Sequence, residues 1–283
     1  MGDIQVVSNP AKPTIGMMIL EADEPHPETS ERKGTFAKIL HQHFSTVGEA
    51  HDPPLGVMSN NVFLVSERGG RIPKIEEFEK HHAVLITGSI HDAHGDDPWI
   101  LELLDLLREL WTRRPDIRFS GVCFGHQILC RLLGAEVAPS PSKDWELGHS
   151  KINLNKLGQK LFRTDDPEIY LHQMHQDHVV APPTPQSSNG LLSPGTSVEV
   201  WGHSEHTAVQ GVYIPGRLFT TQAHLAFDEE MVKRQIEMRV NMGSIDDTEH
   251  ADMAAERADL EHDGEVAAAA ILRFFHGEDD EIA

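Results

Sequence analysis

Short apolar runs alternate with longer amphipathic runs in the first half of the chain. The short runs are rich in β-branched residues and end in polar or glycine residues, which predicts strands buried on both faces of a sheet. They cover residues 14–20, 61–67, 83–89 and 117–123. The longer runs place apolar residues three or four positions apart, as amphipathic helices do. They cover residues 32–44, 96–116 and 124–133. Strands that alternate with helices predict a parallel sheet with right-handed crossovers.

The pattern changes in the second half, where short strands follow one another with turns between them. These predicted strands cover residues 150–154, 168–174, 197–204, 207–214 and 217–224. We expect them to form the far edge of the sheet and a small antiparallel addition. Residues 181–197 are rich in Pro, Ser and Gly and predict an exposed loop. Two helices, at 228–240 and 251–275, complete the predicted elements.

No internal repeat or long linker divides these elements. We therefore expect a flexible leader at 1–13, one domain at 14–276 and a frayed acidic tail at 277–283.

Composition narrows the class of partner. The chain has 283 residues, 39% of them hydrophobic and 24% charged, which is ordinary for a globular domain. Its net charge of -21 repels phosphate, so we expect neither a nucleic acid nor a membrane as partner. The two cysteines, seven positions apart on a predicted turn and helix, lie about 10 Å apart, which is too far for a disulfide. Without a signal peptide or disulfides, we expect the cytoplasm, with the nucleus as an alternative.

Residues 117–134 contain the most informative stretch, in which Cys123 stands between two glycines where a strand meets a helix. A nucleophile elbow has this build, because small residues let the strand and helix approach closely. A helix N-terminus also lowers the pKa of a thiol, and the N–H of Phe124 points where an oxyanion would form. The alternative is a buried structural cysteine. Cys130 lies on the apolar face of the helix, which favours packing.

A cysteine nucleophile needs a base, which is commonly a histidine distant in sequence. Among 19 histidines, two stand out. His224 ends a predicted strand just before a helix, so it could share a sheet edge with Cys123. His175 lies in LHQMHQDHV and is, with Asp177, a candidate for the edge of the thiol pocket.

Other polar groups carry weaker signals. His172, His175 and His178 are three positions apart, but a strand would point His175 away from the other two, so we predict no metal site. The stretch TGSIHDAHGDD lacks the lysine of a phosphate-binding loop. We expect no cofactor. Trp145 and Glu146 either line the pocket or pack in the core.

Several segments together resemble the class I glutamine amidotransferase superfamily, triad type. GVCFGHQILCRLLGAEV resembles its elbow, ITGSIHDAHGDDPWI its oxyanion strand and VYIPGRLFTTQAHLAFDEEM its histidine strand. WELGHSKINL, LHQMHQDHV and EHDGEVAAAAILRFF resemble further segments, so the resemblance spans residues 14–275. It is nearest the small stand-alone branch that includes γ-glutamyl peptidases. The resemblance implies an α/β fold: a flavodoxin-like mixed sheet with a parallel core and helices on both faces.

The resemblance also implies roles. Cys123 would attack a γ-glutamyl amide and form a γ-glutamyl thioester, while His224 would move the proton. The backbone N–H groups of Gly88 and Phe124 would form the oxyanion hole. Gln127 would help to seat the substrate, and His175 is a second candidate for that role. Without an obvious synthetase domain, an ammonia acceptor would require a partner protein, so free-standing hydrolysis of a small γ-glutamyl molecule is the simpler expectation. The sequence leaves a synthetase partner and a homo-oligomer open.

One departure from the family pattern bears on activity. The family has His-Pro-Glu where this chain has His224-Leu225-Ala226, so the acid that orients the imidazole is missing. Asp228 and Glu229 are nearby but in a different register. The alternative function is therefore a catalytically impaired binding or regulatory protein.

Overall fold

The computed structural model describes residues 12–279 and 282. Most of the predicted leader and three residues of the predicted tail therefore lie outside the described residues. Asp279, which belongs to that tail, is not frayed. Its buried carboxylate accepts hydrogen bonds from Arg118 at 2.6 Å and from the hydroxyl of Tyr213 at 2.7 Å.

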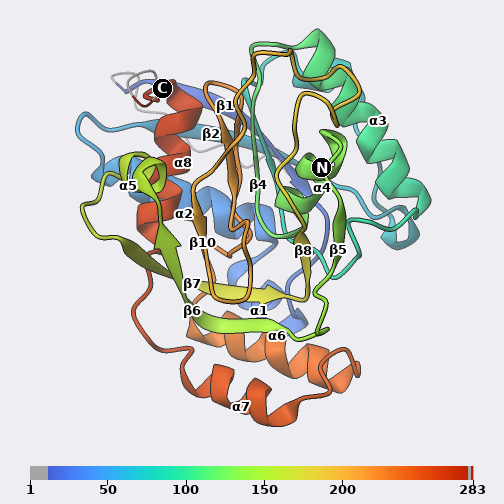
Figure 1. The fold of residues 1–283 in the computed structure, drawn as a ribbon, viewed down its shortest axis with the longest axis vertical. Coiled ribbons are helices and arrows are strands. Elements are labelled where there is room, and N and C mark those ends of the chain that lie inside the picture. The colour runs from blue at the N-terminus through green and yellow to red at the C-terminus, as the bar shows by residue number, and fades with distance from the viewer. Residues whose placement is uncertain (1–11, 280–281, 283) are drawn as a thin grey trace.

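A seven-stranded mixed sheet forms the centre of the molecule (Figure 1). Its strands are β1 (Thr14–Glu21), β2 (Gly56–Phe63), β3 (Ala83–Ile86), β4 (Arg118–Gly121), β9 (Glu199–Val200), β11 (Val212–Ile214) and β12 (Leu218–Phe219). The order is β2-β1-β3-β4-β12-β11-β9. The first five are parallel, and β11 and β9 add antiparallel pairs at one edge. The predicted parallel core with an antiparallel addition is confirmed.

Helices cover both faces of this sheet because successive strand residues point to opposite sides. Met17 and Ile19 of β1 join one apolar core with α2 (Phe36–Ala50) and α8 (Gly264–His276). Met18 and Leu20 join the other core with α3 (Pro98–Arg113) and α4 (Phe124–Leu132). Figure 1 shows the two helix pairs on opposite sides of the sheet. Among the described residues, no helix combines the length and apolar character needed to cross a bilayer.

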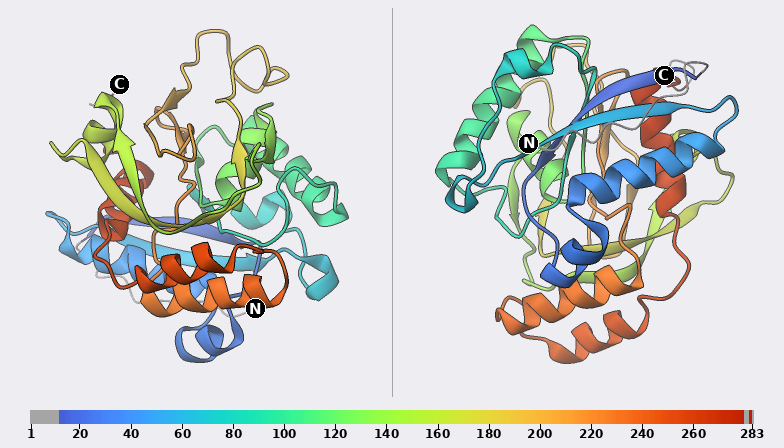
Figure 2. Two further views of the ribbon diagram at one scale, coloured as in Figure 1. Left: turned by 60° about the horizontal axis from the view of Figure 1, so that its bottom comes forward. Right: turned by 180° about the vertical axis from the view of Figure 1, so that it is seen from behind.

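Smaller elements build a second layer at the carboxyl end of the parallel strands. β6 (Glu146–Leu154), β7 (Glu168–His175) and β10 (Gly202–His203) form one antiparallel sheet, and β5 (Val137–Pro139) pairs with β8 (Asp177–Val179). The helices α6 (Glu229–Asn241) and α7 (Thr248–Glu256) lie side by side against β6 and β7 (Figure 2). The remaining elements are α1 (Pro27–Lys33), α5 (Lys156–Phe162) and two 3-10 turns at Ser66–Arg68 and Ile75–Phe78.

Several predicted elements have wrong bounds. The strands expected at 207–214 and 217–224 are shorter, at Val212–Ile214 and Leu218–Phe219, and three other elements differ for a local reason. The helix expected at 32–44 is broken at Gly34, which has φ +88°, and α2 begins after Thr35, whose hydroxyl caps it. The strand expected at 61–67 begins at Gly56, because residues 56–60 also pair in register with β1. The helix expected at 251–275 is two helices, separated by the polar stretch 257–263. Residues 181–197 contain no helix or strand, as predicted.

Candidate active site

Cys123 stands at a sharp turn between β4 and α4. Its φ of 52° lies in the left-handed region, which a non-glycine residue adopts at a cost. Its N–H donates to the carbonyl of Thr221 at 2.9 Å, and its own carbonyl accepts from the N–H of Gln127 at 3.0 Å. A Cβ on Gly121 would lie 2.2 Å from the carbonyl carbon of Gly125, so the turn requires a glycine there. The structure therefore holds Cys123 in a strained elbow.

The thiol of Cys123 is buried at the wall of a polar pocket. The residue is 5% exposed, and the pocket has a volume of about 310 Å³. Burial raises the pKa of the thiol to about 11, although the charge of Arg239 and the N–H of Phe124 act in the opposite direction. The expected lowering by the helix N-terminus is therefore outweighed by desolvation. Near neutral pH the thiol is protonated, and it points toward the carbonyl of Met174 at 3.9 Å.

The imidazole of His224 lies close to Cys123 because Gly88, which has no side chain, is packed against both residues. A Cβ on Gly88 would lie 2.8 Å from Cε1 of His224 and 3.5 Å from Cβ of Cys123, so only glycine allows both side chains to come this close. The N–H of His224 donates to the carbonyl of His172 at 2.9 Å, and its ring stacks on Phe227 at 3.9 Å. Burial, with the nearby charge of Arg239, lowers the pKa of His224 well below its usual value. The ring is neutral and can accept a proton.

No carboxylate orients His224 among the described residues. Its Nε2 is buried and has no hydrogen-bond partner. The ring and Ala226 line the same small apolar cavity of about 30 Å³. Asp228 caps α6 by accepting from the N–H of Met231, and it pairs with Lys33. Glu229 pairs with Lys233 at 2.7 Å. Neither acid replaces the missing carboxylate.

The loop that follows β3 carries Gly88 and is fastened to the end of β1. The hydroxyl of Thr87 accepts from the N–H of Ala22 at 2.9 Å and donates to the carbonyl of Gly88 at 3.0 Å. The buried carboxylate of Asp23 accepts from the N–H of Ile90 at 3.0 Å. Sequence reasoning missed Asp23, although its place just after a buried strand was a signal. These bonds fix the backbone that would supply an oxyanion donor.

Gln127 lines the thiol pocket from the first turn of α4. Its side-chain Nε2 donates to the carbonyl of Asp177 at 2.8 Å and to Oε1 of Gln222 at 3.1 Å. These bonds tie the helix to two neighbouring segments. Gln127 therefore shapes the pocket, and its amide N–H groups are already in use.

His175 also lines the pocket, but both of its ring nitrogens are engaged. Nε2 lies 3.0 Å from Oε2 of Glu146, and Nδ1 lies 2.9 Å from the carbonyl of Asp177. Burial opposes ionisation of Glu146, but the hydrogen bond and charge of His175 together lower the pKa of that carboxyl. Both ring nitrogens therefore lie against acceptor oxygens, and neither faces Cys123 as a free base.

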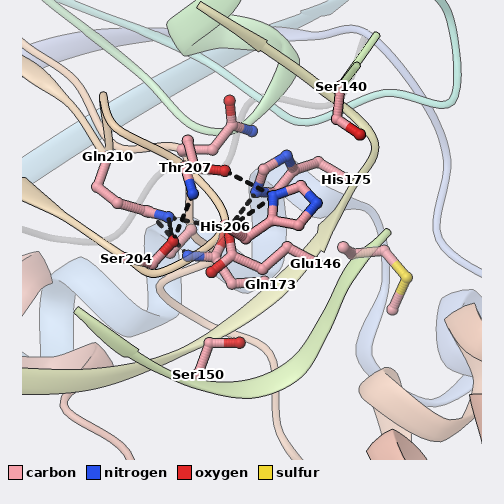
Figure 3. A network of polar contacts seen from close by, with 12 residues as sticks. Ser140, Glu146, Ser150, Gln173, His175, Ser204, His206, Thr207 and Gln210 are labelled. Atoms are coloured by element: carbon pink, nitrogen blue, oxygen red, sulfur yellow. Dashed lines mark hydrogen bonds and ion pairs between the residues drawn. The ribbon is translucent and has the colours of Figure 1, made fainter. Parts of the chain in front are cut away.

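Figure 3 shows this pair within a wider polar network. His206 lies 3.7 Å from Glu146, and Gln210 donates to Glu146 at 3.0 Å and to Ser204 at 3.1 Å. The network holds β6 and β7 together behind the pocket, with Glu146 as its central acceptor.

The histidines at 172, 175 and 178 do not converge on one point. The described side chains that could jointly hold an ion are instead Asp92, His94 and Asp177, at the side of the thiol pocket. His94 pairs with Asp177 at 3.2 Å. Carboxylates and an imidazole placed in this way form an acidic rim beside the thiol.

The far wall of the pocket comes from α6 and the residues after it, which sequence reasoning missed. Arg239, Met242 and Ser244 line the pocket together with Cys123. Arg239 is buried on the same face of α6 as Val232 and Ile236. A cation on an apolar helix face was the feature of the sequence that could have indicated a functional residue.

A larger cleft adjoins the thiol pocket. Its volume is about 1200 Å³, and Trp145, Gln176 and Ser244 line both spaces. The indole of Trp145 is fixed by donating to the carbonyl of Ser244 at 3.1 Å. Trp145 and Glu146 both line this cleft, and Glu146 is also part of the buried network. A molecule bound at the thiol therefore has room to extend into a polar channel.

Comparison with known proteins identifies the family of the chain. Residues 64–235 match the family model described as "Glutamine amidotransferase class-I". A glutamine amidotransferase-like protein of Schizosaccharomyces pombe is 28% identical over 257 residues, which are 90% of this chain and 96% of that protein. Gamma-glutamyl peptidase 3 of Arabidopsis thaliana is 28% identical over 227 residues, 78% of this chain and 82% of the relative.

The fold has solved counterparts. The crystal structure of a glutamine amidotransferase from Methylobacillus flagellatus superposes with a TM-score of 0.60 and 21% identity, covering 94% of this chain and 93% of that one. At this identity the likeness concerns the fold. Because the family model spans more than half of the sequence, this chain belongs to the glutamine amidotransferase class-I family.

Proposed function

We propose that this protein is a cysteine-dependent hydrolase that cleaves the amide bond of a γ-glutamyl group through a γ-glutamyl thioester on Cys123. The observation that carries the proposal is the elbow itself. A thiol held at a left-handed turn faces a pocket, with the N–H of Phe124 on one side and the imidazole of His224 against Gly88 on the other. Nucleophile, base and oxyanion donors are the parts that acyl transfer requires.

The reaction begins when Nδ1 of His224, on the side of Gly88 and Cys123, takes the proton from the thiol of Cys123. The sulfur then attacks the γ-carbonyl, and the oxyanion is bound by the backbone N–H groups of Gly88 and Phe124. His224 gives its proton to the amine as the C–N bond breaks. Water then attacks the thioester, His224 takes a proton from it, and that proton returns to the sulfur as glutamate leaves.

The size of the adjoining cleft favours a γ-glutamyl peptide or conjugate over free glutamine. Glutamine would release ammonia and leave the cleft of about 1200 Å³ without a role. A larger amine would extend past Trp145 into that space. Relatives of this chain are named gamma-glutamyl peptidases, which supports the same substrate class. A reducing compartment such as the cytoplasm would keep the thiol free.

A second candidate function is a binding or regulatory protein with little turnover. The observation that favours it is the buried Nε2 of His224, which has no partner. Without an acid, the imidazolium that forms during catalysis is poorly stabilised.

Product release separates the two. Purified wild-type protein and Cys123→Ala are incubated with glutamine and with γ-glutamyl dipeptides, and glutamate is measured. We expect release by the wild type only, and faster release from dipeptides. No release from any substrate, with the protein folded, would support the binding function.

A further inference from the structure

A buried arginine without an acidic partner lies in the pocket of the thiol. Arg239 is 8% exposed and lines the same pocket as Cys123. From Nη1 it donates to the side-chain oxygen of Gln235 at 2.5 Å and to its carbonyl at 3.3 Å. Within the described part of the chain, no acid forms an ion pair with it. Burial of an unpaired charge is expensive and requires a compensating role. Partly buried Arg118 pairs with Asp279, whereas Arg273, equally buried and also without an ion pair among the described residues, donates to the carbonyl of Leu161 outside the pocket.

We propose that Arg239 is the counter-ion of the Cys123 thiolate. Its charge would take over the role that the imidazolium of His224 has in a complete triad, where an acid stabilises that imidazolium. The inference rests on the proposed function, in which Cys123 is the nucleophile. In a complete triad, the acid stabilises the charged imidazole that forms beside the nucleophile. Here Ala226 occupies the position of the acid and Nε2 of His224 has no acceptor. A guanidinium stays charged throughout and needs no acid to hold it.

The surroundings of the thiol leave Arg239 as the cation suited to this role. The titratable and charged groups around the pocket are His91, Asp92, His94, His175, Asp177, His224 and Arg239. Burial lowers the pKa of Arg239, and the charges of Cys123 and Asp23 act in the opposite direction. The ring of His175 lies 3.0 Å from Oε2 of Glu146 and is engaged there. Burial makes the largest contribution to the raised pKa of Cys123, and the charge of Asp177 raises it further. The charge of Arg239 lowers it. The guanidinium and the acidic rim therefore act on the sulfur in opposite directions.

The same charge also assists the leaving group. When His224 takes the thiol proton, the electron pair stays on sulfur and is stabilised by Arg239. The imidazolium is then next to a like charge, which lowers the pKa of His224 further than burial alone. The ring therefore gives its proton readily to the departing amine. The same charge makes the ring a weaker base toward the thiol, so the gain comes from the stabilised sulfur and from proton transfer to the amine, and Arg239 replaces the missing carboxylate only in part.

Thiol alkylation tests the inference without any substrate. Cys123 is alkylated with iodoacetamide from pH 6.5 to 10, and its peptide is quantified by mass spectrometry, with Cys130 as an internal reference. We expect Arg239→Gln to slow alkylation of Cys123 by about tenfold or more at each pH and to move the profile to higher pH. Arg239→Lys keeps the charge and should retain most of the rate. Arg273→Gln removes an equally buried arginine outside the pocket and should leave the profile unchanged.

A second comparison links the arginine to the missing acid. Ala226→Glu should increase the alkylation rate of Cys123 by a larger factor in the Arg239→Gln variant than in the wild type. Without Arg239, the imidazolium of His224, stabilised by the new acid, becomes the counter-ion of the thiolate. Where Arg239→Gln does not fold, as judged by thermal unfolding, Arg239→Met replaces it.

The inference is overturned if a folded, charge-free variant at 239 keeps the wild-type alkylation profile. That result, with weakened binding of γ-glutamyl ethylamide to Cys123→Ala, would make Arg239 a substrate anchor only. If alkylation follows the expected pattern but no γ-glutamyl compound is hydrolysed, the proposed function fails and the counter-ion remains.

Discussion

Restoring a carboxylate beside His224 is the most informative change that the site allows. Ala226→Glu would place an acid in the small apolar cavity that Ala226 shares with the imidazole, where Nε2 has no partner. Leu225 is better left unchanged, because its side chain is buried in the core that contains α2 and α8. The single substitution therefore isolates the effect of the acid.

The substitution should have two opposing effects, a gain in activity and a loss of stability. Loss of the acid from a serine triad lowers kcat by about 10⁴-fold, and a thiol depends on it less, so we expect kcat/KM to rise about 10- to 100-fold. Against this, the cavity of about 30 Å³ has room for roughly one water-sized group, and glutamate adds four heavy atoms. Phe36 and Met231 must shift, which should cost about 1–3 kcal/mol of stability.

The assay is glutamate release from a γ-glutamyl dipeptide, measured with thermal unfolding of the same samples. Ala226→Gln is the matched control, since it has nearly the volume of glutamate and lacks the charge. An equal gain from Ala226→Gln would attribute the effect to packing. A folded Ala226→Glu protein with no gain would show that the lost acid does not limit catalysis, and the reasoning would be refuted.

Three further predictions follow from the same contacts. Because the pKa of the Cys123 thiol is raised to about 11 and that of His224 is lowered, the pair shares one proton from pH 7 to 10, so kcat/KM should be nearly flat there, and a rise of about tenfold per pH unit would show that His224 does not take the thiol proton. Gly88→Ala would place a methyl group 2.8 Å from the imidazole of His224 and should lower activity at least about tenfold. The control Gly195→Ala adds a methyl group in open space and should leave activity unchanged. Equal activities of the two variants would show that the ring can move aside. Burial lowers the pKa of three histidines most strongly: His126 to about 3, His172 to about 4, and His224 well below its usual value. The unfolded chain binds these protons near pH 6.5 and the folded chain does not, so stability is complete above that pH and falls by about 4 kcal/mol per unit toward pH 4. Urea unfolding at pH 7, 6 and 5 measures this slope, and equal midpoints would reject it.

The sheet could be predicted because its strands are short apolar runs with clear ends. The elbow was visible for a similar reason, since Gly121 and Gly125 are required by close backbone contacts that leave few alternatives. Helix ends were harder to predict. The break between α7 and α8 depends on Asp263, whose side chain accepts from the N–H of Tyr170 on β7, and that partner is distant in sequence.

The pocket was only partly predictable. Cys123 and His224 carry their signal in local motifs, but the wall that faces them comes from α6, whose place depends on packing against β7. Arg239 therefore gave no sign of its role beyond an odd position on an apolar face. The pKa of the thiol was also expected in the wrong direction, because a helix N-terminus is a local feature and burial is a property of the whole fold.

Covalent capture on the thiol tests the central claim most directly. The wild-type protein is incubated with a glutamine analogue that carries an electrophile at the γ-position, digested and mapped by mass spectrometry. The account predicts one adduct, on the peptide of Cys123, that is absent from Cys123→Ala and is reduced by an excess of a γ-glutamyl dipeptide. No adduct, or an adduct on Cys130 alone, would contradict it.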